Sequence, residues 1–416
     1  MAVGRRQLRI DAEQLETHIQ TLGAIGALPE GGLYRPVYGQ SWVDAMALLE
    51  RWFAQAGLEV RHDAVGSLFG RATGRDTEDG VVLTGSHVDT VLRGGRYDGA
   101  LGIHASLAAL RSLLDAFGRP RRSIEVVALC EEEGSRFHCT FWGTRAMLGL
   151  IAPDEPDALR DADGITIGAA MAQVGFDPAA IPSARRSDLA AFLELHIEQG
   201  PVLASAGLDL GIPHTITGQR QLAVTIHGRQ DHAGTTPMDL RLDPLVAAAR
   251  MIERITLAAD SMGRPAVATI GRIEARPGAV NVVADSVRFT IDTRHSDALQ
   301  RLALIEQIEA AIGEVAAAAG VKVSIERLIE LEPVPLDGEV RSLLTSAARD
   351  EGLRYLEMPS GAGHDSQVMA QHLPTGMIFV PSREGRSHSP EEFTPIDQVV
   401  PGVRVLARAL YELAYR

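Results

Sequence analysis

The sequence predicts an α/β fold with a mostly parallel sheet, into which a smaller α+β domain is inserted. Three observations predict this fold. Short, continuous apolar runs alternate with helical patterns in the first half of the chain, the middle instead alternates apolar and polar residues, and the end returns to the first pattern. Continuous apolar runs are typical of strands buried on both faces, and strands that alternate with helices favour a parallel sheet. A chain of 416 residues is also long enough to form two hydrophobic cores.

The elements of the first half follow from hydrophobic periodicity. Ser41 to Asp44 fits a capping box, in which a hydroxyl and an acid satisfy free N–H groups at a helix start, and Gly57 is a natural end for that helix. Short, continuous apolar runs are predicted as buried strands, and a longer periodic segment as a helix. The predicted strands are residues 81–83, 124–129 and 192–197, and the helix is residues 100–117.

The middle of the chain predicts the inserted domain. Alternating residues at 221–227 and 286–293 indicate half-solvated antiparallel strands, and alanine-rich patterns at 244–259 and 298–319 indicate two long helices that cover them. After this region the α/β pattern resumes with a helix at 338–350 and an apolar strand at 377–380. The predicted domains are residues 1–213 with 331–416, and residues 214–330, joined through proline-rich hinges at 211–213 and 333–335.

Composition and charge exclude several classes of protein. The 40 lysines and arginines against 54 acids give a net charge of −14, which is unfavourable for binding nucleic acid. Two cysteines, Cys130 and Cys139, are too few for a disulfide scaffold or a cysteine-based zinc site. No apolar run is expected to reach the length of a membrane span, and the N-terminal sequence MAVGRRQLRI lacks the apolar core of a signal peptide. We therefore expect a cytoplasmic protein with no nucleic-acid or membrane partner.

Ionisable side chains follow two of the predicted strands at the point where each strand ends. His87, Asp89 and Asp98 come after the strand at 81–83, in the segments TGSHVDT and GGRYDG. Three adjacent acids at residues 131–133 follow the strand at 124–129. Ligands bind open α/β sheets beyond the carboxyl ends of the strands, and a carboxylate near a histidine orients it as a metal ligand. Either segment alone is also explained as a solvated loop.

The same pattern recurs after two further strands, and the recurrence argues for a metal site. His196 and Glu198 lie at the end of the strand at 192–197, and His388 and Glu391 follow the strand at 377–380. Four strand ends with histidines or acids at one sheet edge are difficult to explain without bound cations. Ligation by histidine and carboxylate without cysteine suits zinc, manganese or cobalt in an open catalytic site, and an acid that is not a ligand can serve as a general base.

The other candidate residues have good structural explanations as well. In the predicted inserted domain, His232 and Asn281 lie in turn-rich segments and Arg294 ends a strand, so a cap, a turn residue and an exposed arginine are reasonable alternatives. The segment from Gly361 to Asp365 resembles a helix start, whose free N–H groups can face an anion. No phosphate-binding loop, nucleophile elbow, His-Glu-x-x-His motif or dinucleotide fingerprint is present.

These motifs together resemble the amidase/hydantoinase/carbamoylase branch of the M20 peptidase superfamily, which has a dinuclear metal site. Members of this branch include N-carbamoyl-L-amino-acid hydrolases, allantoate amidohydrolases and one type of β-ureidopropionase. The resemblance covers nearly the whole chain in order. It runs through GSHVDTV, GGRYDG, EEEGSRF, HIEQGPVL, DHAGTTPM, NVVADSVRFTIDTR, SGAGHDSQ and GRSHSPEE. The segments HIEQGPVL and SGAGHD are specific to this branch.

The resemblance implies a role for each candidate residue. It implies two divalent metal ions per subunit, zinc above all, with manganese or cobalt as alternatives. In the metal-binding domain the implied ligands are His87 and His196 for one ion and Glu133 and His388 for the other, with Asp98 as the bridge, Asp89 orienting His87 and Glu132 as general base. The implied substrate contacts are Gln199, His232, Asn281, Arg294 and Gly361, of which His232 also stabilises the oxyanion.

The resemblance also implies a reaction and an assembly. It implies hydrolysis of the ureido C–N bond of an N-carbamoyl-L-amino acid, with the carboxylate bound by Arg294, in a homodimer that forms through the inserted domain. That domain also acts as a lid, and its His232 and Asn281 reach the partner's site. A cis peptide is implied between Asp98 and Gly99. Allantoate hydrolysis is the nearest alternative, with β-ureidopropionase activity beside it. A dipeptidase or aminoacylase is less consistent with the segment HIEQGPVL, and a binding protein that has lost catalysis is less consistent with the intact motifs.

Overall fold

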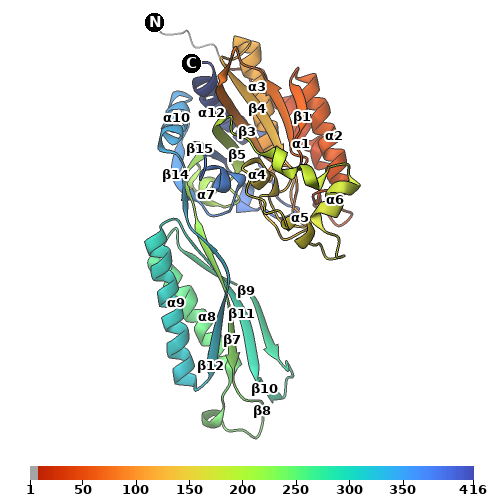
Figure 1. The fold of residues 1–416 in the computed structure, drawn as a ribbon. Helices are drawn as coiled ribbons and strands as arrows, with labels where there is room; N and C mark the ends of the chain where they lie inside the picture. Colours follow the sequence, from red (N-terminus) through yellow and green to blue (C-terminus); the bar gives the residue numbers. More distant parts are fainter. Residues whose placement is uncertain (1–7) are drawn as a thin grey trace. The chain divides into compact units, whose positions relative to one another are not determined.

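The computed structural model describes residues 8–416, which form two compact units (Figure 1). The first unit contains the chain up to His214, Leu336–Met358 and Gly363–Arg416; the second contains Thr215–Pro335 and Pro359–Ala362. The second unit is therefore an insertion in the sequence of the first. Residues 1–7, which carry much of the argument against a signal peptide, lie outside the described residues.

A mixed sheet forms the centre of the first unit. Its order is β1-β2-β4-β3-β5-β15-β6, with β14 also paired to β6, and it continues to β13 through residues of the second unit. The four central strands β4, β3, β5 and β15 are parallel, whereas β1, β2 and β6 pair antiparallel at the two sides. The strands are β1 (Glu59–His62), β2 (Leu68–Ala72), β3 (Asp76–His87), β4 (Arg122–Leu129), β5 (Leu189–Ile197), β6 (Leu210–Ile216), β13 (Val334–Pro335), β14 (Tyr355–Ser360) and β15 (Thr375–Val380).

Helices cover both faces of this sheet. The larger core lies between the sheet and α1, α2, α3, α10 and α12, and a smaller core around Leu83 and Phe192 includes Met147 of α4 and Met369 of α11. The α-helices are α1 (Ala12–Gly23), α2 (Gln40–Gln55), α3 (Ala100–Phe117), α4 (Trp142–Met147), α5 (Glu155–Ala158), α6 (Ile167–Gln173), α7 (Val202–Ala206), α10 (Gly338–Asp350), α11 (Asp365–Met369) and α12 (Ile396–Ala414). Two 3-10 helices, η1 (Pro178–Ala184) and η3 (Arg383–Gly385), complete the described elements of this unit.

The expected capping box at the start of α2 is wrong. The helix begins at Gln40 after Gly39, which has no side chain to cap it. The Ser41 hydroxyl instead donates to the Tyr34 carbonyl at 2.9 Å, and the Asp44 carboxylate accepts from the Gln40 side chain at 2.8 Å. The pattern of hydroxyl and acid therefore begins two residues after the N-cap position, too late to act as a cap.

Helix α3 is long and apolar. Its 18 residues reach a mean hydropathy of 1.2, so the helix has the length and composition of a membrane span although Arg111 and Asp115 interrupt the apolar run. Of these residues 67% are buried inside the fold, against the central strands. A core helix covered on most sides shows this composition without a membrane. The cytoplasmic location stays a prediction.

The second unit is an antiparallel sheet covered by two helices. The strand order is β12-β7-β11-β9, and α8 and α9 pack against the sheet around Phe289 and Ile308. Side-chain caps define both helix starts: Asp243 accepts from Leu245 N and Val246 N, and Asp297 accepts from Gln300 N. The elements are β7 (Gly218–His227), β8 (Asp231–His232), η2 (Met238–Leu240), α8 (Pro244–Met262), β9 (Val267–Arg276), β10 (Val282–Val283), β11 (Ser286–His295), α9 (Ala298–Ala319) and β12 (Lys322–Leu331).

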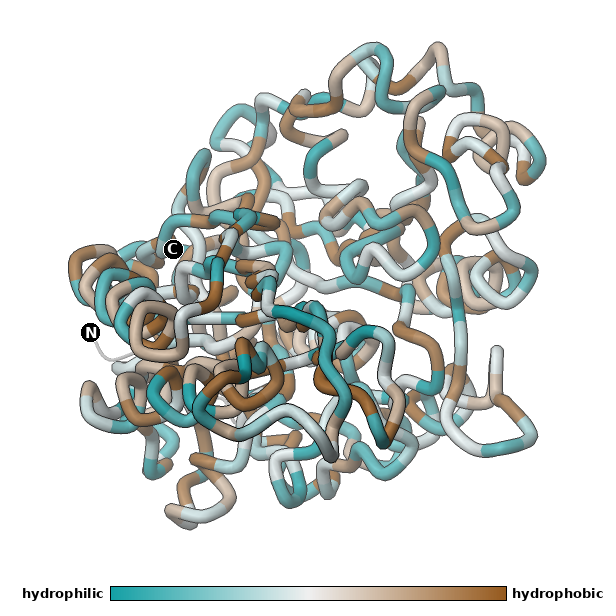
Figure 2. The backbone as a smooth tube through the Cα atoms, turned by 90° about the horizontal axis from the view of Figure 1, so that it is seen from below, coloured by the Kyte–Doolittle hydropathy of each residue, from teal (hydrophilic) through white to brown (hydrophobic). Residues whose placement is uncertain are grey.

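Hydrophobic and hydrophilic positions alternate over short distances along the backbone (Figure 2). This pattern is expected for elements that bury one face and expose the other. The central strands are the exception, because every residue of β15 is buried. The fold class predicted from the sequence is confirmed at this level: an α/β unit with a parallel sheet centre and a separate unit with an antiparallel sheet.

Candidate metal centre

The parallel centre of the sheet brings four segments of ionisable residues to one edge. Because β4, β3, β5 and β15 are parallel neighbours, their carboxyl ends meet at the same side of the sheet. His87 is the last residue of β3 and aligns with Leu129, the last residue of β4. His196 is the last but one residue of β5, and the loop that carries His388 follows β15. The sheet topology alone therefore concentrates histidines and acids at this edge.

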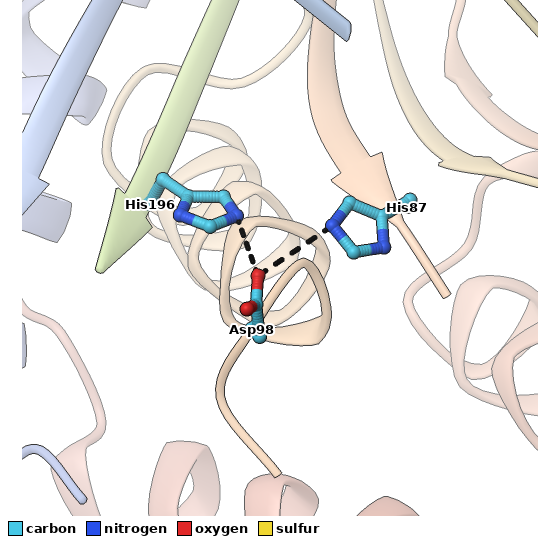
Figure 3. Close-up of side chains that lie close together, drawn as sticks. All are labelled: His87, Asp98 and His196. Carbon is cyan, nitrogen blue, oxygen red and sulfur yellow. Dashed lines mark ion pairs between the residues drawn. The ribbon is translucent and has the colours of Figure 1, made fainter. Parts of the chain in front are cut away.

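Asp98 is the residue on which the histidines converge (Figure 3). Its Oδ1 atom lies 3.2 Å from Nε2 of His196 and 3.7 Å from Nε2 of His87. Figure 3 shows the two imidazoles approaching this carboxylate from the ends of two different strands, while Asp98 lies on the segment that leads into α3. All three side chains are buried, with exposed residue fractions between 1% and 5%.

The second oxygen of Asp98 faces another pair of donors. Nε2 of His388 lies 3.3 Å from Oδ2 of Asp98 and 3.5 Å from Oε1 of Glu133. Two groups of three potential ligands result, His87 with Asp98 and His196, and Asp98 with Glu133 and His388; within each group the ligand atoms lie within 4.8 Å of one another. The two groups share Asp98. One carboxylate thus lies between two candidate groups of ligand-type side chains.

Hydrogen bonds orient the histidines so that Nε2 faces Asp98. His196 Nδ1 lies 2.9 Å from the Ile197 carbonyl, which leaves Nε2 as the atom directed at the carboxylate. His87 Nδ1 lies 3.1 Å from the Asp89 carbonyl and 3.3 Å from its Oδ1. A carbonyl or carboxylate partner at one ring nitrogen fixes the tautomer and makes the other nitrogen a good ligand.

Asp89 also determines where the acids after β4 lie. Its Oδ1 accepts from the backbone N–H of Glu132 at 2.9 Å, and its Oδ2 accepts from that of Glu133 at 3.1 Å. One fully buried carboxylate thus connects the loop after β3 with the loop after β4. Glu132 lies with His87 and Glu133 in a further group whose potential ligand atoms are within 4.8 Å of one another.

The electrostatics of the cluster are those of buried acids that lack enough positive charge. Burial raises the pKa of Glu132 well above its usual range, and burial together with the nearby Asp98 raises the pKa of Glu133 to about 7. Burial alone would raise the pKa of Asp98 too, but hydrogen bonds from His196, His388 and His87 hold it well below the usual value. The hydrogen bond to Asp98 raises the pKa of His388 to about 9.

The donor set fits divalent cations. Among the described residues, Oε1 of Glu133 and both carboxylate oxygens of Glu131 are buried without a hydrogen-bond partner. Leaving such groups unpaired is costly, and divalent cations would neutralise the mutual repulsion of the acids. Imidazole and carboxylate donors without a thiolate suit zinc, manganese or cobalt. The two cysteines are free and do not belong to any candidate ligand group within the described residues.

Strained backbone occurs at two residues of the cluster. Gln199 has φ of 57° and His388 has φ of 53°, a region that residues with a Cβ seldom adopt. Strain of this kind is concentrated at functional sites. Gln199, predicted as a substrate contact, donates from Nε2 to Oδ2 of Asp98 at 2.8 Å, so it also holds the shared carboxylate.

The implied cis peptide between Asp98 and Gly99 is wrong. The cis peptides of the described chain are Arg264–Pro265 and Arg276–Pro277. The sharp turn after Asp98 is formed instead by Gly99, which has φ of 64° and ψ of −60°. A Cβ at this position would overlap the His87 ring, so only glycine allows the turn beside the cluster.

The remaining predicted site residues belong to the second unit, where they form two separate groups. His232 pairs with Val282 in the β8–β10 ribbon, and the Asn281 carbonyl accepts from Ala233 N at 3.1 Å. Nδ1 of His232 accepts from the backbone N–H groups of Gly234 and Thr235 at 3.0 and 3.2 Å, so the ring proton of the neutral form is on the exposed Nε2.

Arg294 and Gly361 form the other group. Arg294 donates from Nη1 to the Gly361 carbonyl at 2.7 Å and from Nε and Nη2 to the Asp292 carboxylate at 3.0 and 3.2 Å. Strand β11 begins at Ser286, just after β10, and Arg294 lies at its far end. The two groups are therefore separated by the length of β11, about 26 Å at the usual rise of a strand.

Several residues around the centre were not assigned from the sequence. Glu392 accepts hydrogen bonds from the backbone N–H groups of Tyr97 and Asp98, and Ser387 donates to Oδ2 of Asp98. Glu194 and His364 form a further ligand-type group with His196, but Glu194 already accepts from the hydroxyls of Ser86 and Ser366. The sequence signal that could have identified Glu392 is its position directly after His388-Ser-Pro-Glu391.

Comparison with known proteins identifies the family of the chain. The family model of peptidase family M20/M25/M40 matches residues 83–412, which is most of the chain. The chain belongs to this family. An allantoate amidohydrolase from Bacillus subtilis is 42% identical over 402 residues, which are 96% of this chain and 97% of the relative. An N-carbamoyl-L-amino-acid amidohydrolase from Paenarthrobacter aurescens is 40% identical over 410 residues, 97% of this chain and 98% of the relative.

A solved structure from this family has the same fold. An amidase of the hydantoinase/carbamoylase family from Burkholderia multivorans superimposes with a TM-score of 0.93 at 32% identity, covering 98% of this chain and 99% of that one. The resemblance predicted from the sequence motifs is thus confirmed at the level of the family. The protein is a hydrolase of the amidohydrolase type.

We expect Gly99→Ala to abolish metal binding without unfolding the protein. The new Cβ would overlap the His87 ring, and alanine disfavours the positive φ of this position. Gly313→Ala in α9 is the matched control, because no atom lies within 4 Å of its added Cβ. Metal content per chain after dialysis against zinc measures the effect. Unchanged zinc content in a folded Gly99→Ala variant would contradict the role of this turn.

Proposed function

We propose that the protein is a metal-dependent amidohydrolase that hydrolyses the ureido C–N bond of an N-carbamoyl-L-amino acid, giving the free amino acid, carbon dioxide and ammonia. The observation that carries this proposal is the sharing of Asp98 by two groups of ligand-type side chains at the carboxyl edge of the sheet. In the proposed centre, His87 and His196 would hold one divalent cation and Glu133 and His388 would hold the other, with Asp98 belonging to both groups of ligands. Zinc is the proposed ion, with manganese or cobalt as alternatives.

The residues of the chain then have distinct tasks. When bound, the two cations supply Lewis acidity to the scissile carbonyl and to the attacking water. Glu132 accepts the proton of that water on its carboxylate and returns it to the leaving nitrogen, a task for which a raised pKa is suited. Asp89 holds the backbone of Glu132 and the ring of His87, and so sets the position of the base relative to the cluster. His232 donates from Nε2 to the developing oxyanion.

Arg294 is the proposed contact of the substrate carboxylate. Its three hydrogen bonds to Gly361 and Asp292 use three of the five N–H groups of a guanidinium. Among its contacts with the described residues, one N–H on each Nη nitrogen remains, and this pair matches the two oxygens of a carboxylate. Gly361 and Asp292 thereby fix the guanidinium in place before a substrate arrives.

We further propose that the active site is shared between two subunits of a homodimer. His232 and Asn281 lie at one end of β11 and Arg294 lies at the other, so one second unit does not present both groups to one small substrate. A partner's second unit supplies His232 and Asn281 in the proposed dimer, and closure of that unit excludes water. The dimer forms through the second unit.

Allantoate is a second candidate substrate. It also presents a ureido group and a carboxylate, so the same contacts serve it, and the Bacillus subtilis relative named for this activity is slightly more similar than the carbamoylase relative. The side-chain pocket decides between the two substrates, because the reacting group is common to both.

A substrate panel on the zinc-loaded protein tests the proposed activity. We expect ammonia release from N-carbamoyl-L-amino acids, with allantoate and N-carbamoyl-β-alanine as comparisons and an N-acetyl amino acid as the control without a ureido group. Preference is measured as kcat/KM, and hydrolysis of the N-acetyl compound and of a dipeptide is followed by release of the free amino acid, because these substrates give no ammonia. Hydrolysis of the N-acetyl compound or a dipeptide at a higher kcat/KM than every ureido compound would reject the proposal.

Glu132→Gln should keep both cations and lose turnover. The amide has nearly the same shape but does not accept the proton of the water, so we expect kcat to fall by about 100-fold or more. Metal content per chain, measured beside the rate, separates this effect from loss of the ions. A variant that turns over at the parent rate would remove Glu132 from the role of base.

Mixing two inactive variants tests whether the active site is shared. Glu132→Gln and His232→Ala subunits, unfolded together and refolded, form mixed dimers in which one site has an intact Glu132 and the partner's intact His232. We expect activity to reappear in the mixture and not in either parent alone. Activity that stays absent in mixed dimers, verified by two different affinity tags, would show that each chain uses its own His232.

A further inference from the structure

Glu392 is a buried acid that contacts the backbone of Asp98, the residue that carries the shared carboxylate. Only 4% of the residue is exposed. Its Oε1 accepts from the backbone N–H groups of Tyr97 and Asp98 at 2.8 and 3.0 Å. Its Oε2 lies 3.0 Å from the Ser387 hydroxyl. One carboxylate therefore joins the segment that carries Asp98 to the segment that carries His388.

Ser387 completes the connection to the side chain of Asp98. Its hydroxyl lies 2.8 Å from Oδ2 of Asp98, on the oxygen that also faces His388. Because a hydroxyl has one proton, Ser387 donates to one of the two carboxylates at a time. Glu392 thus fixes the backbone of Asp98 directly, and Ser387, which lies between the two carboxylates, contacts Oδ2 of Asp98.

The glycine-rich segment before Asp98 is shaped to accept this acid. A Cβ at Gly95 would overlap the carboxylate of Glu392, so the close approach needs glycine there. The neighbouring Glu391 differs from Glu392 in its exposure and in its partners. It is exposed, its partners are Ser389 and Arg386, and it makes no contact with the Asp98 segment among the described interactions.

We propose that Glu392 is a positioning residue that holds Asp98 so that its two oxygens face the two cation sites. This inference rests on the proposed function, in which Asp98 contacts both cations. Partners that hold a ligand from behind contribute to affinity because the ligand does not have to be ordered when the ion binds. Removing such a partner typically weakens metal binding about 10–100-fold. Since Asp98 belongs to both groups of ligands, the loss should affect both sites.

The experiment measures zinc binding to the metal-free full-length protein by equilibrium dialysis. The variants are Glu392→Ala, Glu392→Gln and Ser387→Ala, with Glu391→Ala as the matched control on the adjacent residue. Thermal unfolding of each metal-free variant is recorded beside the binding curve, so that a folding defect is recognised. Ser387→Ala keeps the backbone contacts of Glu392 and provides a second variant if Glu392→Ala does not fold.

The expected results distinguish positioning from a general structural role. Glu392→Ala should bind both zinc ions about 10–100-fold more weakly than the parent, and Ser387→Ala should show a smaller loss in the same direction. Glu392→Gln should restore binding, because its amide oxygen accepts the two N–H groups and its NH₂ group donates to Ser387, which then donates to Asp98. Glu391→Ala should bind like the parent.

Two other outcomes overturn the proposal. If Glu392→Ala binds zinc with the parent's affinity in a folded protein, Glu392 does not position Asp98. If Glu392→Gln binds as weakly as Glu392→Ala, the charge and not the hydrogen-bond pattern is what matters, and positioning is rejected. A parent protein that binds no zinc, manganese or cobalt would instead reject the proposed function, which keeps the two failures apart.

Discussion

The constraint on which the centre depends is the burial of Asp98 among three histidines. A carboxylate this deep is stable as an anion only because His87, His196 and His388 approach it from three segments of the first unit. Two of these histidines lie at the ends of parallel strands, so their positions are set by the sheet and not by flexible loops. The geometry of the site therefore depends on the sheet. The parallel register of β3 and β5 places His87 and His196 beside the same carboxylate.

Hydrogen bonds to the backbone hold the segments that carry the candidate ligands. The Asp89 carboxylate accepts hydrogen bonds from two backbone N–H groups of the loop after β4. The Glu392 carboxylate accepts hydrogen bonds from two backbone N–H groups of the segment before α3. Each buried acid thus connects two loops that follow different strands. Fixing loops from behind reduces the freedom that would be lost when a cation or substrate binds. The rigid arrangement is consistent with the strained backbone at Gln199 and His388, which only a well-supported site retains.

Sequence patterns predicted much of this arrangement, for reasons that differ between elements. Apolar runs located the central strands because a strand buried on both faces appears in the sequence as a continuous apolar run. Helices α3, α9 and α10 begin and end where their patterns do. The capping box at Ser41 failed because the same residues make equally good bonds elsewhere. The order of β4, β3, β5 and β15 was not readable from the chain, and only that order turns four separate motifs into one cluster.

The residues that sequence reasoning missed are those whose role depends on distant backbone. Glu392 is separated from Tyr97 by nearly three hundred positions, and no spacing rule connects a carboxylate to a backbone N–H so far along the chain. Glu391 and Glu392 are chemically identical in the sequence, yet one is exposed and the other is buried. The discriminating fact is the close approach at Gly95, which is visible only once the loops are folded.

The charge of the cluster finally determines the order of events in the proposed reaction. Asp89, Asp98 and the acids at 131–133 gather at one edge of a protein whose net charge is −14. Without cations this edge would repel a substrate that carries a carboxylate, since the interaction of like charges is strong where water is excluded. Two divalent ions would offset the local negative charge at this edge, while the rest of the protein surface would stay acidic. In the proposed reaction we therefore expect metal binding to precede substrate binding, and we expect the substrate to be attracted by the metal-loaded centre and by Arg294 and not by the overall field of the protein.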